Sequence, residues 1–229
     1  MIRLERPGLL LRHAPTWLQQ QGVDTTALRR VLASSVAWEQ PLVTVYGRQP
    51  RTPRLTCWVA DPGCSYRYSG LVQTITPWTT ELSALRERLA LELGVRFNSL
   101  LLNRYRDGAD RMGWHADDEP ELDHAAPIAS ISLGVSRDLR FRPRAGNEPA
   151  FNVRLDDGDL LVMDPPSQQH WQHALPVRAR VQTERINLTF RVIQPRTAMQ
   201  SISTRAPLGS AATSTQARAG ETPSPNTSA

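Results

Sequence analysis

Short candidate strands separated by turn residues fill the chain after Gly94, and they restrict it to a mainly β fold. Each run is rich in β-branched, aromatic or leucine side chains and is short for a helix. The Asp157-Gly158 pair is a turn signal between two of the runs. Many short strands of this kind are typical of a barrel or a double-sheet jelly roll. The runs are RFNSLLLNRY, PIASISLG, DLRFRPR, FNVRL, GDLLVM and RINLTFRVI.

Two helices are expected before these strands. One covers residues 25–36, and the other runs from Thr80, which can cap it, to Leu93, where Gly94 can end it. Leucines three and four residues apart give the second helix an apolar face. They are Leu82, Leu85, Leu89 and Leu93. The expected fold class is therefore mainly β with flanking helices (α+β).

The composition changes near residue 195. Beyond it Ser, Thr, Ala and Pro prevail, and large apolar side chains are rare. Such a segment cannot bury enough surface to offset the entropy lost on ordering. We therefore expect one domain over residues 1–195 and a disordered tail over residues 196–229.

The last strand, residues 185–191, predicts a polar cavity. Its side chains alternate between two faces. One face carries Arg185, Asn187, Thr189 and Arg191, and the other carries Ile186, Leu188 and Phe190. Two arginines beside an amide and a hydroxyl indicate a site for a small dianion. The arginines lie roughly 20 Å apart along an ideal strand, so the strand must twist to aim both at one ligand. A solvent-facing edge strand is the alternative.

Charge and cysteine content bound the class of protein without deciding it. All 27 basic residues are arginine, and the formal net charge is +5. Arginine forks suit phosphate oxygens, although a GC-rich genome produces the same bias.

Cys57 and Cys64 are too few for a disulfide scaffold and fit a reducing compartment. We find no signal peptide and no apolar stretch near the roughly 18 residues of a membrane span. The chain is expected to be soluble and cytoplasmic, with no membrane contact.

Three of the five histidines stand in segments that can bind a metal. GWHADDE places His115 and Asp117 on one face of an extended segment, and HWQHALP contains His170 and His173. One His-x-Asp with a distant His supplies the facial triad that binds Fe(II) and leaves three positions open. His-x-Asp alone is a weak signal, and a zinc hydrolase uses similar ligands. The downstream arginines favour iron with 2-oxoglutarate, because the far carboxylate of that keto acid needs a fixed cation.

Four sequence blocks resemble, in order and spacing, the AlkB family of nucleic-acid dealkylases. The resemblance is strongest to the animal homologues that repair double-stranded DNA, and it covers roughly residues 43–192. Agreement of several independent blocks is more specific than any single motif. The blocks are NRYRDGADRMGWHADDE, PIASISLG, HWQHALPVR and RINLTFR.

The resemblance implies a double-stranded β-helix core, with a nucleotide-recognition region over about residues 40–78 of the dioxygenase domain. It makes His115, Asp117 and His173 the iron ligands and catalytic residues. His173 is preferred over His170 because it stands before Ala-Leu-Pro, as in the family pattern.

The resemblance also implies a binding site for 2-oxoglutarate. Asn103 and Tyr105 would contact the keto acid from one strand. Arg185 would hold the far carboxylate, and Arg191 would lie near the iron-bound end. Asn187 shares their cavity face.

Substrate contacts follow from the resemblance at four positions. Tyr66 and Tyr68 match a pair that packs around a flipped base, although they are also ordinary strand aromatics. Asp118 and Glu119 can accept hydrogen bonds from an exocyclic amino group, or else form a solvated acidic loop. Trp114 departs from the family pattern before the metal histidine, which leaves the base preference open.

A finger hairpin is implied at Val45-Tyr46-Gly47. An aromatic tip at Tyr46 can fill the gap left when a base leaves its stack. Arg48, Arg51 and Arg54 follow the finger, where they can meet phosphates.

Together these features imply a DNA oxidative demethylase that depends on Fe(II), 2-oxoglutarate and O2. Its substrates would be alkylated DNA bases such as 1-methyladenine and 3-methylcytosine, and its products the repaired base, formaldehyde, succinate and CO2. We expect a monomer. One alternative is a 2-oxoglutarate-dependent oxygenase that acts on RNA, protein or a small molecule. Another is a non-catalytic nucleic-acid-binding module, which would need neither the triad nor both arginines.

Overall fold

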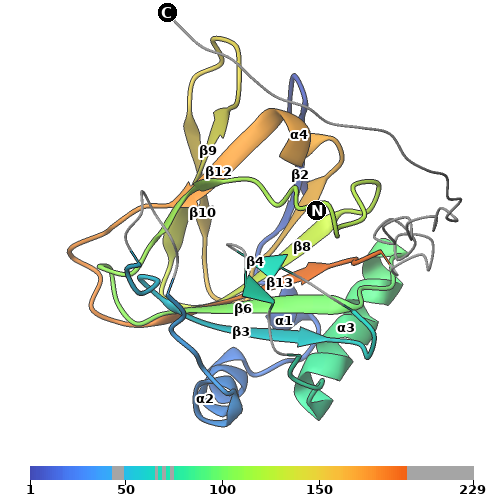
Figure 1. Cartoon of the computed structure of the whole chain (residues 1–229), viewed down its shortest axis with the longest axis vertical. Helices are drawn as coiled ribbons and strands as arrows, with labels where there is room; N and C mark the ends of the chain where they lie inside the picture. Colours follow the sequence, from blue (N-terminus) through green and yellow to red (C-terminus); the bar gives the residue numbers. More distant parts are fainter. Residues whose placement is uncertain (43–48, 65–66, 69–70, 73–74, 195–229) are drawn as a thin grey trace, which may run out of the picture. The chain divides into compact units, whose positions relative to one another are not determined.

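Two antiparallel sheets make up most of the structure (Figure 1). The computed structural model describes residues 1–42, 49–64, 67–68, 71–72 and 75–194, with the backbone alone at 67–68 and 71–72. The major sheet contains, in spatial order, β1 (Ile2–Arg6), β2 (Leu9–Ala14), β11 (Leu160–Asp164), β8 (Ile128–Gly134), β13 (Arg185–Arg191), β6 (Ser99–Tyr105) and β3 (Leu55–Ala60). The minor sheet contains β10 (Phe151–Leu155), β9 (Arg137–Pro143), β12 (Trp171–Leu175) and β7 (Met112–His115). A further pair is formed by β4 (Arg67–Tyr68) and β5 (Leu71–Val72).

The major sheet lies between a helical layer and the minor sheet (Figure 1). Leucines of α2 (Thr25–Ser35) and α3 (Thr80–Leu93) pack in one core with the Ile186, Leu188 and Phe190 face of β13. A second core fills the space between the sheets and includes Phe141 and Trp171 from the minor sheet. Two short helices, α1 (Trp17–Gln20) and α4 (Ser167–His170), complete the described elements. This arrangement confirms the expected jelly roll.

Strand β13 occupies the middle of the major sheet. It pairs with β8 on one side and β6 on the other, and all seven of its residues are buried. The alternative of a solvent-facing edge strand is therefore wrong. Since a central strand has both edges satisfied and both faces covered, its polar face must line an internal cavity.

Helix α3 has the bounds expected from the sequence, but its cap lies one residue earlier. The Thr79 hydroxyl, not that of Thr80, accepts from the Leu82 N–H at 3.3 Å. Thr79 has the extended backbone that an N-cap requires, whereas Thr80 is already helical. Gly94 ends the helix with φ 68°, a conformation that favours glycine. The other expected helix ends at Ser35, with Val36 as its C-cap.

Six predicted strands correspond to β6, β8, β9, β10, β11 and β13. The sequence does not predict β1, β2, β3, β7 or β12. The expected tail, residues 196–229, and the finger at Tyr46 lie outside the described residues. The chain divides near Arg196, which is close to the expected domain boundary.

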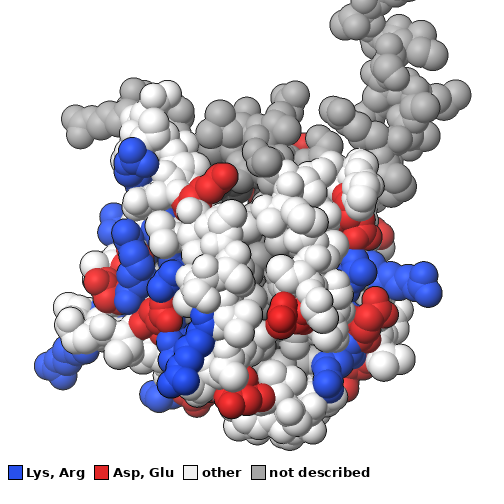
Figure 2. Space-filling view, turned by 90° about the horizontal axis from the view of Figure 1, so that it is seen from below, with Lys and Arg blue, Asp and Glu red and all other residues white. Residues whose placement is uncertain are grey.

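The face on which α2 lies shows arginine and acidic side chains interspersed (Figure 2). The described residues visible there form no extended surface of one sign, so this face is not favoured for docking a polyanion. Within the described ranges, every helix is too short or too polar to cross a membrane.

Candidate metal and co-substrate site

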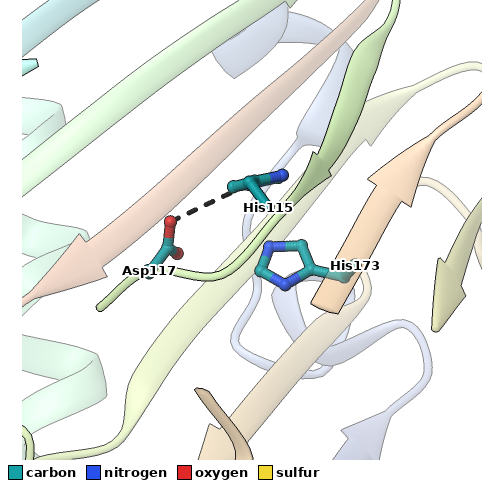
Figure 3. A group of neighbouring side chains, drawn as sticks. All are labelled: His115, Asp117 and His173. Atoms are coloured by element: carbon teal, nitrogen blue, oxygen red, sulfur yellow. Dashed lines mark ion pairs between the residues drawn. The ribbon is translucent and has the colours of Figure 1, made fainter. Parts of the chain in front are cut away.

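Three side chains converge between the two sheets (Figure 3). His115 ends β7 and His173 lies opposite it on β12, so the two imidazoles pair across adjacent strands with ring centroids 4.2 Å apart. Asp117 follows β7, and its carboxylate oxygen is 3.8 Å from His115 Nε2. One ligand atom from each side chain lies within 4.8 Å of the others. Two imidazoles and one carboxylate at this spacing can hold one metal ion. His170 is exposed on α4 and lies outside the cluster.

A β-bulge aims the His115 imidazole. His173 pairs with His115, but Leu175 pairs with Met112, so β7 carries one extra residue between these pairs. The bulge lets His115 Nδ1–H donate to the Gly113 carbonyl at 2.9 Å. That hydrogen bond fixes the tautomer in which Nε2 has no proton and faces Asp117.

Arg191 holds the carboxylate of Asp117. Its Nη2 donates to Asp117 Oδ1 at 2.7 Å, and both side chains are buried. Burial alone would raise the pKa of Asp117, but Arg191 and the two imidazoles outweigh it and lower the pKa to about 2. The Asp117 backbone N–H donates to Gln168 Oε1 from α4 at 3.0 Å. The carboxylate is therefore ionised and oriented by Arg191, while Gln168 holds the Asp117 backbone.

Both imidazoles are neutral near pH 7. Burial, followed by the neighbouring His115, lowers the pKa of His173 to about 3, and burial also lowers the pKa of His115. Metal ions bind neutral imidazole and ionised carboxylate. The triad is therefore held in the protonation state that a metal ion requires.

The metal-free protein should lose stability as the pH falls below about 6.5. Below that pH His173 becomes protonated in the unfolded chain, whereas in the folded chain its imidazole stays neutral down to a pH of about 3. In this window each such group lowers the unfolding free energy by up to about 1.4 kcal/mol per pH unit. We would measure urea unfolding with chelator present at about pH 7.5 and 5. His173→Gln should show the shallower pH dependence, and equal slopes would contradict the buried neutral imidazole.

A cavity next to the triad is lined by the residues expected to bind 2-oxoglutarate. They are Asn103, Tyr105, Arg185, Asn187 and Arg191, from β6 and β13. Asn103 faces Asn187 across the sheet, and Tyr105 faces Arg185. The twist of these strands thus brings both arginines to one cavity, as the sequence requires for a single dianion.

Arg185 is a buried cation surrounded by uncharged partners. It is 2% exposed and donates to Ser132 Oγ at 2.8 Å and Asn187 Oδ1 at 2.7 Å. Among the residues that the structure describes, it has no carboxylate within ion-pair distance, and its Nε is buried without a hydrogen-bond partner. Burial lowers its pKa to about 10, so it stays charged at neutral pH. A buried, uncompensated guanidinium fits the far carboxylate of 2-oxoglutarate.

Of the residues expected to contact DNA, the structure describes only some. Arg54 is 3% exposed and donates from Nε to Asn103 Oδ1 at 2.7 Å, so its guanidinium is directed to the interior and its expected phosphate contact stays a prediction. A strand start beside the cavity turns this side chain inwards. Tyr46 and Tyr66 lie outside the described residues, and of Tyr68 only the backbone is described.

Asp118 borders a second cavity beside the triad. This cavity has a volume of about 300 Å³, adjoins Asp117 and is also lined by Arg144. The Asp118 carboxylate forms an ion pair with Arg144, and Glu119 is half-buried. Gln168 lines the same cavity and is absent from the sequence-based prediction, because no spacing relates α4 to the metal motif.

Comparisons with known proteins identify the family of the chain. A family model described as "2OG-Fe(II) oxygenase superfamily" matches residues 10–191. "DNA oxidative demethylase ALKBH2" of Mus musculus is 44% identical over 67% of this chain and 67% of its own length. The Homo sapiens protein of that name is 42% identical over 66% of this chain and 60% of its own length. "Alpha-ketoglutarate-dependent dioxygenase alkB homolog 3" of Rattus norvegicus is 35% identical over 72% of this chain and 58% of its own length.

The chain thus spans between about three fifths and two thirds of the length of these relatives. A solved structure described as "The structure of OsALKBH1" has a TM-score of 0.53 at 20% identity, and covers 82% of this chain and 99% of its own. That similarity supports the fold. Family model and relatives together show that the chain belongs to the 2OG-Fe(II) oxygenase superfamily and, within it, to the AlkB family of Fe(II)- and 2-oxoglutarate-dependent dioxygenases.

Proposed function

We propose that the chain oxidatively demethylates N-alkylated DNA bases such as 1-methyladenine and 3-methylcytosine, as part of DNA alkylation repair. In this proposal His115, Asp117 and His173 hold Fe(II). The observation that carries it is the convergence of their ligand atoms within 4.8 Å, beside a cavity that contains Arg185 and Arg191. The names of the relatives, DNA oxidative demethylases among them, support DNA as the substrate.

Different residues along the cavity bind the co-substrate and orient the metal ligands. Arg185 anchors the far carboxylate of 2-oxoglutarate, which directs the keto acid end towards Asp117 and Arg191. Arg191 keeps Asp117 ionised and oriented, and the Gly113 carbonyl orients His115. When bound, Fe(II), 2-oxoglutarate and O2 supply the oxidising chemistry.

The substrate base is assigned to the Asp118 side of the triad. Asp118 and Glu119 follow the metal motif and accept hydrogen bonds from an exocyclic amino group. Because Asp118 is paired with Arg144 in this structure, binding of the base requires that pair to open or to be shared. The monomeric state, the cytoplasmic location and the nucleotide-recognition role of residues 40–78 are also part of the proposal.

The proposal is tested by an assay on matched DNA and RNA oligonucleotides that carry 1-methyladenine. We expect repaired base and formaldehyde from DNA only when Fe(II) and 2-oxoglutarate are both present. Equal consumption of 2-oxoglutarate with and without nucleic acid would favour an oxygenase of protein or a small molecule. Faster turnover of the RNA oligonucleotide would move the substrate to RNA.

Tyr46→Ala should reduce activity on duplex DNA at least several-fold more than activity on the single strand, because only a duplex has a stack to refill. The measurement is the ratio of kcat/KM on the two forms of one oligonucleotide. Tyr46→Phe keeps the aromatic ring and serves as the matched control. Equal losses on both forms would refute the finger assignment.

A further inference from the structure

A second buried guanidinium lies near the co-substrate cavity, on strand β9. Alternation along β9 turns Arg137, Leu139 and Phe141 inwards, and Arg140 and Arg142 outwards. Leu139 lines the cavity, and Phe141 lies in the core between the sheets. Arg137 therefore occupies a position where the strand pattern calls for an apolar residue, and it is only 2% exposed. A buried cation is costly unless its surroundings compensate it.

The guanidinium of Arg137 ties together the backbone of two loops. It donates from Nη1 to the Asp107 carbonyl at 3.1 Å, and from Nη2 to the carbonyls of Asp110 at 3.1 Å and Pro176 at 2.7 Å. The first loop joins β6 to β7, so it connects Tyr105 to the strand of His115. Pro176 begins the second loop, which joins β12, the strand of His173, to β13, the strand of Arg185. One side chain thus fixes the ends of three strands that carry the site.

The two loops are also bonded directly to each other. The Gly108 N–H donates to the Val181 carbonyl at 2.9 Å, and the Arg178 N–H donates to the Gly108 carbonyl at 2.8 Å. A Cβ atom on Gly108 would lie 1.8 Å from the Arg178 carbonyl oxygen. The backbones are therefore in direct contact, so a shift of Pro176 would pass to the loop that follows Tyr105.

Arg137 and Arg185 also share a neighbour. The Tyr105 ring centroid is 5.9 Å from Arg137 Cζ and 5.7 Å from Arg185 Cζ. The nearby carboxylate of Asp110 is engaged by Arg106 through two hydrogen bonds of 2.8 and 2.9 Å. Arg137 itself has no ion pair with a carboxylate among the described side chains, and three carbonyl dipoles compensate it only in part. Arg137 therefore places a second positive charge near the Arg185 end of the cavity, which the carboxylates of Asp110 and Asp107 offset only in part.

We propose that Arg137 is a positioning residue for the far carboxylate of 2-oxoglutarate. It fixes Tyr105 and Arg185 relative to each other through the two loops, and its charge strengthens the hold of this end of the cavity on a second carboxylate. This inference rests on the assignment of Arg185 to that carboxylate. It gives Arg137 a role in selecting a dicarboxylic keto acid over a monocarboxylic one.

The test compares 2-oxoglutarate with 2-oxopentanoate, which has the same chain length without the far carboxylate. Binding is measured by calorimetry on the Fe(II)-loaded protein under argon, where no turnover occurs. Arg137→Gln should weaken 2-oxoglutarate binding about tenfold and leave 2-oxopentanoate within about twofold. Arg137→Lys keeps the charge and should retain the preference within about threefold. Arg140→Gln, an exposed arginine on the same strand, is the matched control and should change neither affinity.

The outcomes separate this inference from the assignments beneath it. If the unaltered protein does not prefer 2-oxoglutarate over 2-oxopentanoate, the Arg185 assignment fails. If it does, and Arg137→Gln weakens both keto acids equally or neither, Arg137 is a scaffold residue and the inference is overturned. Should Arg137→Gln fail to fold, Arg137→Lys decides, because loss of the preference in a variant that keeps the charge contradicts the proposal.

Discussion

His115→Ala and His173→Ala should abolish demethylation while DNA binding is largely kept. Each variant leaves two of three ligand atoms, too few to hold the metal with a defined open face. DNA affinity should survive because contacts to phosphate supply most of it. Formaldehyde release measures the first quantity, and fluorescence anisotropy with an alkylated duplex measures the second. Asp117→Ala should also abolish demethylation and keep DNA binding. It should lower the free energy of unfolding as well, since it removes the carboxylate that pairs with the buried Arg191.

His170→Ala is the matched control for these variants. His170 stands three residues before His173 in the same motif, but its side chain is exposed on α4 and lies outside the ligand cluster. Its loss should leave both activity and metal content unchanged. Full activity in His115→Ala or His173→Ala, or loss of activity in His170→Ala, would show that the ligand assignment is wrong.

Arg185→Met should raise the KM for 2-oxoglutarate by roughly 10²- to 10³-fold, because it removes a buried partner of a carboxylate. The KM of Arg185→Lys should lie between that of the unaltered protein and that of Arg185→Met, since an ammonium group cannot reproduce the guanidinium fork. Initial rates across a range of 2-oxoglutarate concentrations give KM and kcat separately. At saturating 2-oxoglutarate, kcat should fall far less than kcat/KM.

Arg154→Met provides the control for Arg185→Met. Arg154 is an exposed arginine on β10 whose side chain pairs with Asp156 at the surface. Its replacement changes the net charge equally and should leave the KM for 2-oxoglutarate unchanged. An unaltered KM in Arg185→Met would refute its contact with the far carboxylate.

The elements that the sequence predicts are those whose residues alone impose a pattern. Alternation on β13 separates Arg185 from Ile186 whatever the neighbouring strands are, and leucine spacing with Gly94 defines α3. Strand β7 has no such pattern, because its four residues contain a bulge that exists only in the pairing with β12. The N-terminal strand β2 begins with a short leucine run that a helix and a strand share.

The same distinction applies to the site. The proposed iron ligands and the two cavity arginines follow from what the chemistry requires of residue types, together with the family resemblance. Gln168 and Arg137 do not, because their roles depend on where α4 and β9 meet other segments. Arg54 is a related case: its neighbours in sequence indicate a surface position, whereas its side chain is buried against Asn103.

Two sides of the cavity belong to strands that are unequally protected against solvent exchange. Arg185 and Arg191 belong to β13, whose amide hydrogens are bonded on both sides within the major sheet. His115 belongs to β7, four residues long and, in the described part of the chain, the last strand of its sheet. Local opening begins at such margins, so the amides around His115 should exchange with deuterium long before those of β13. Transient opening of β7 would loosen one imidazole while the proposed keto-acid anchor on β13 stays intact, so we expect release of the metal to be the first step of inactivation.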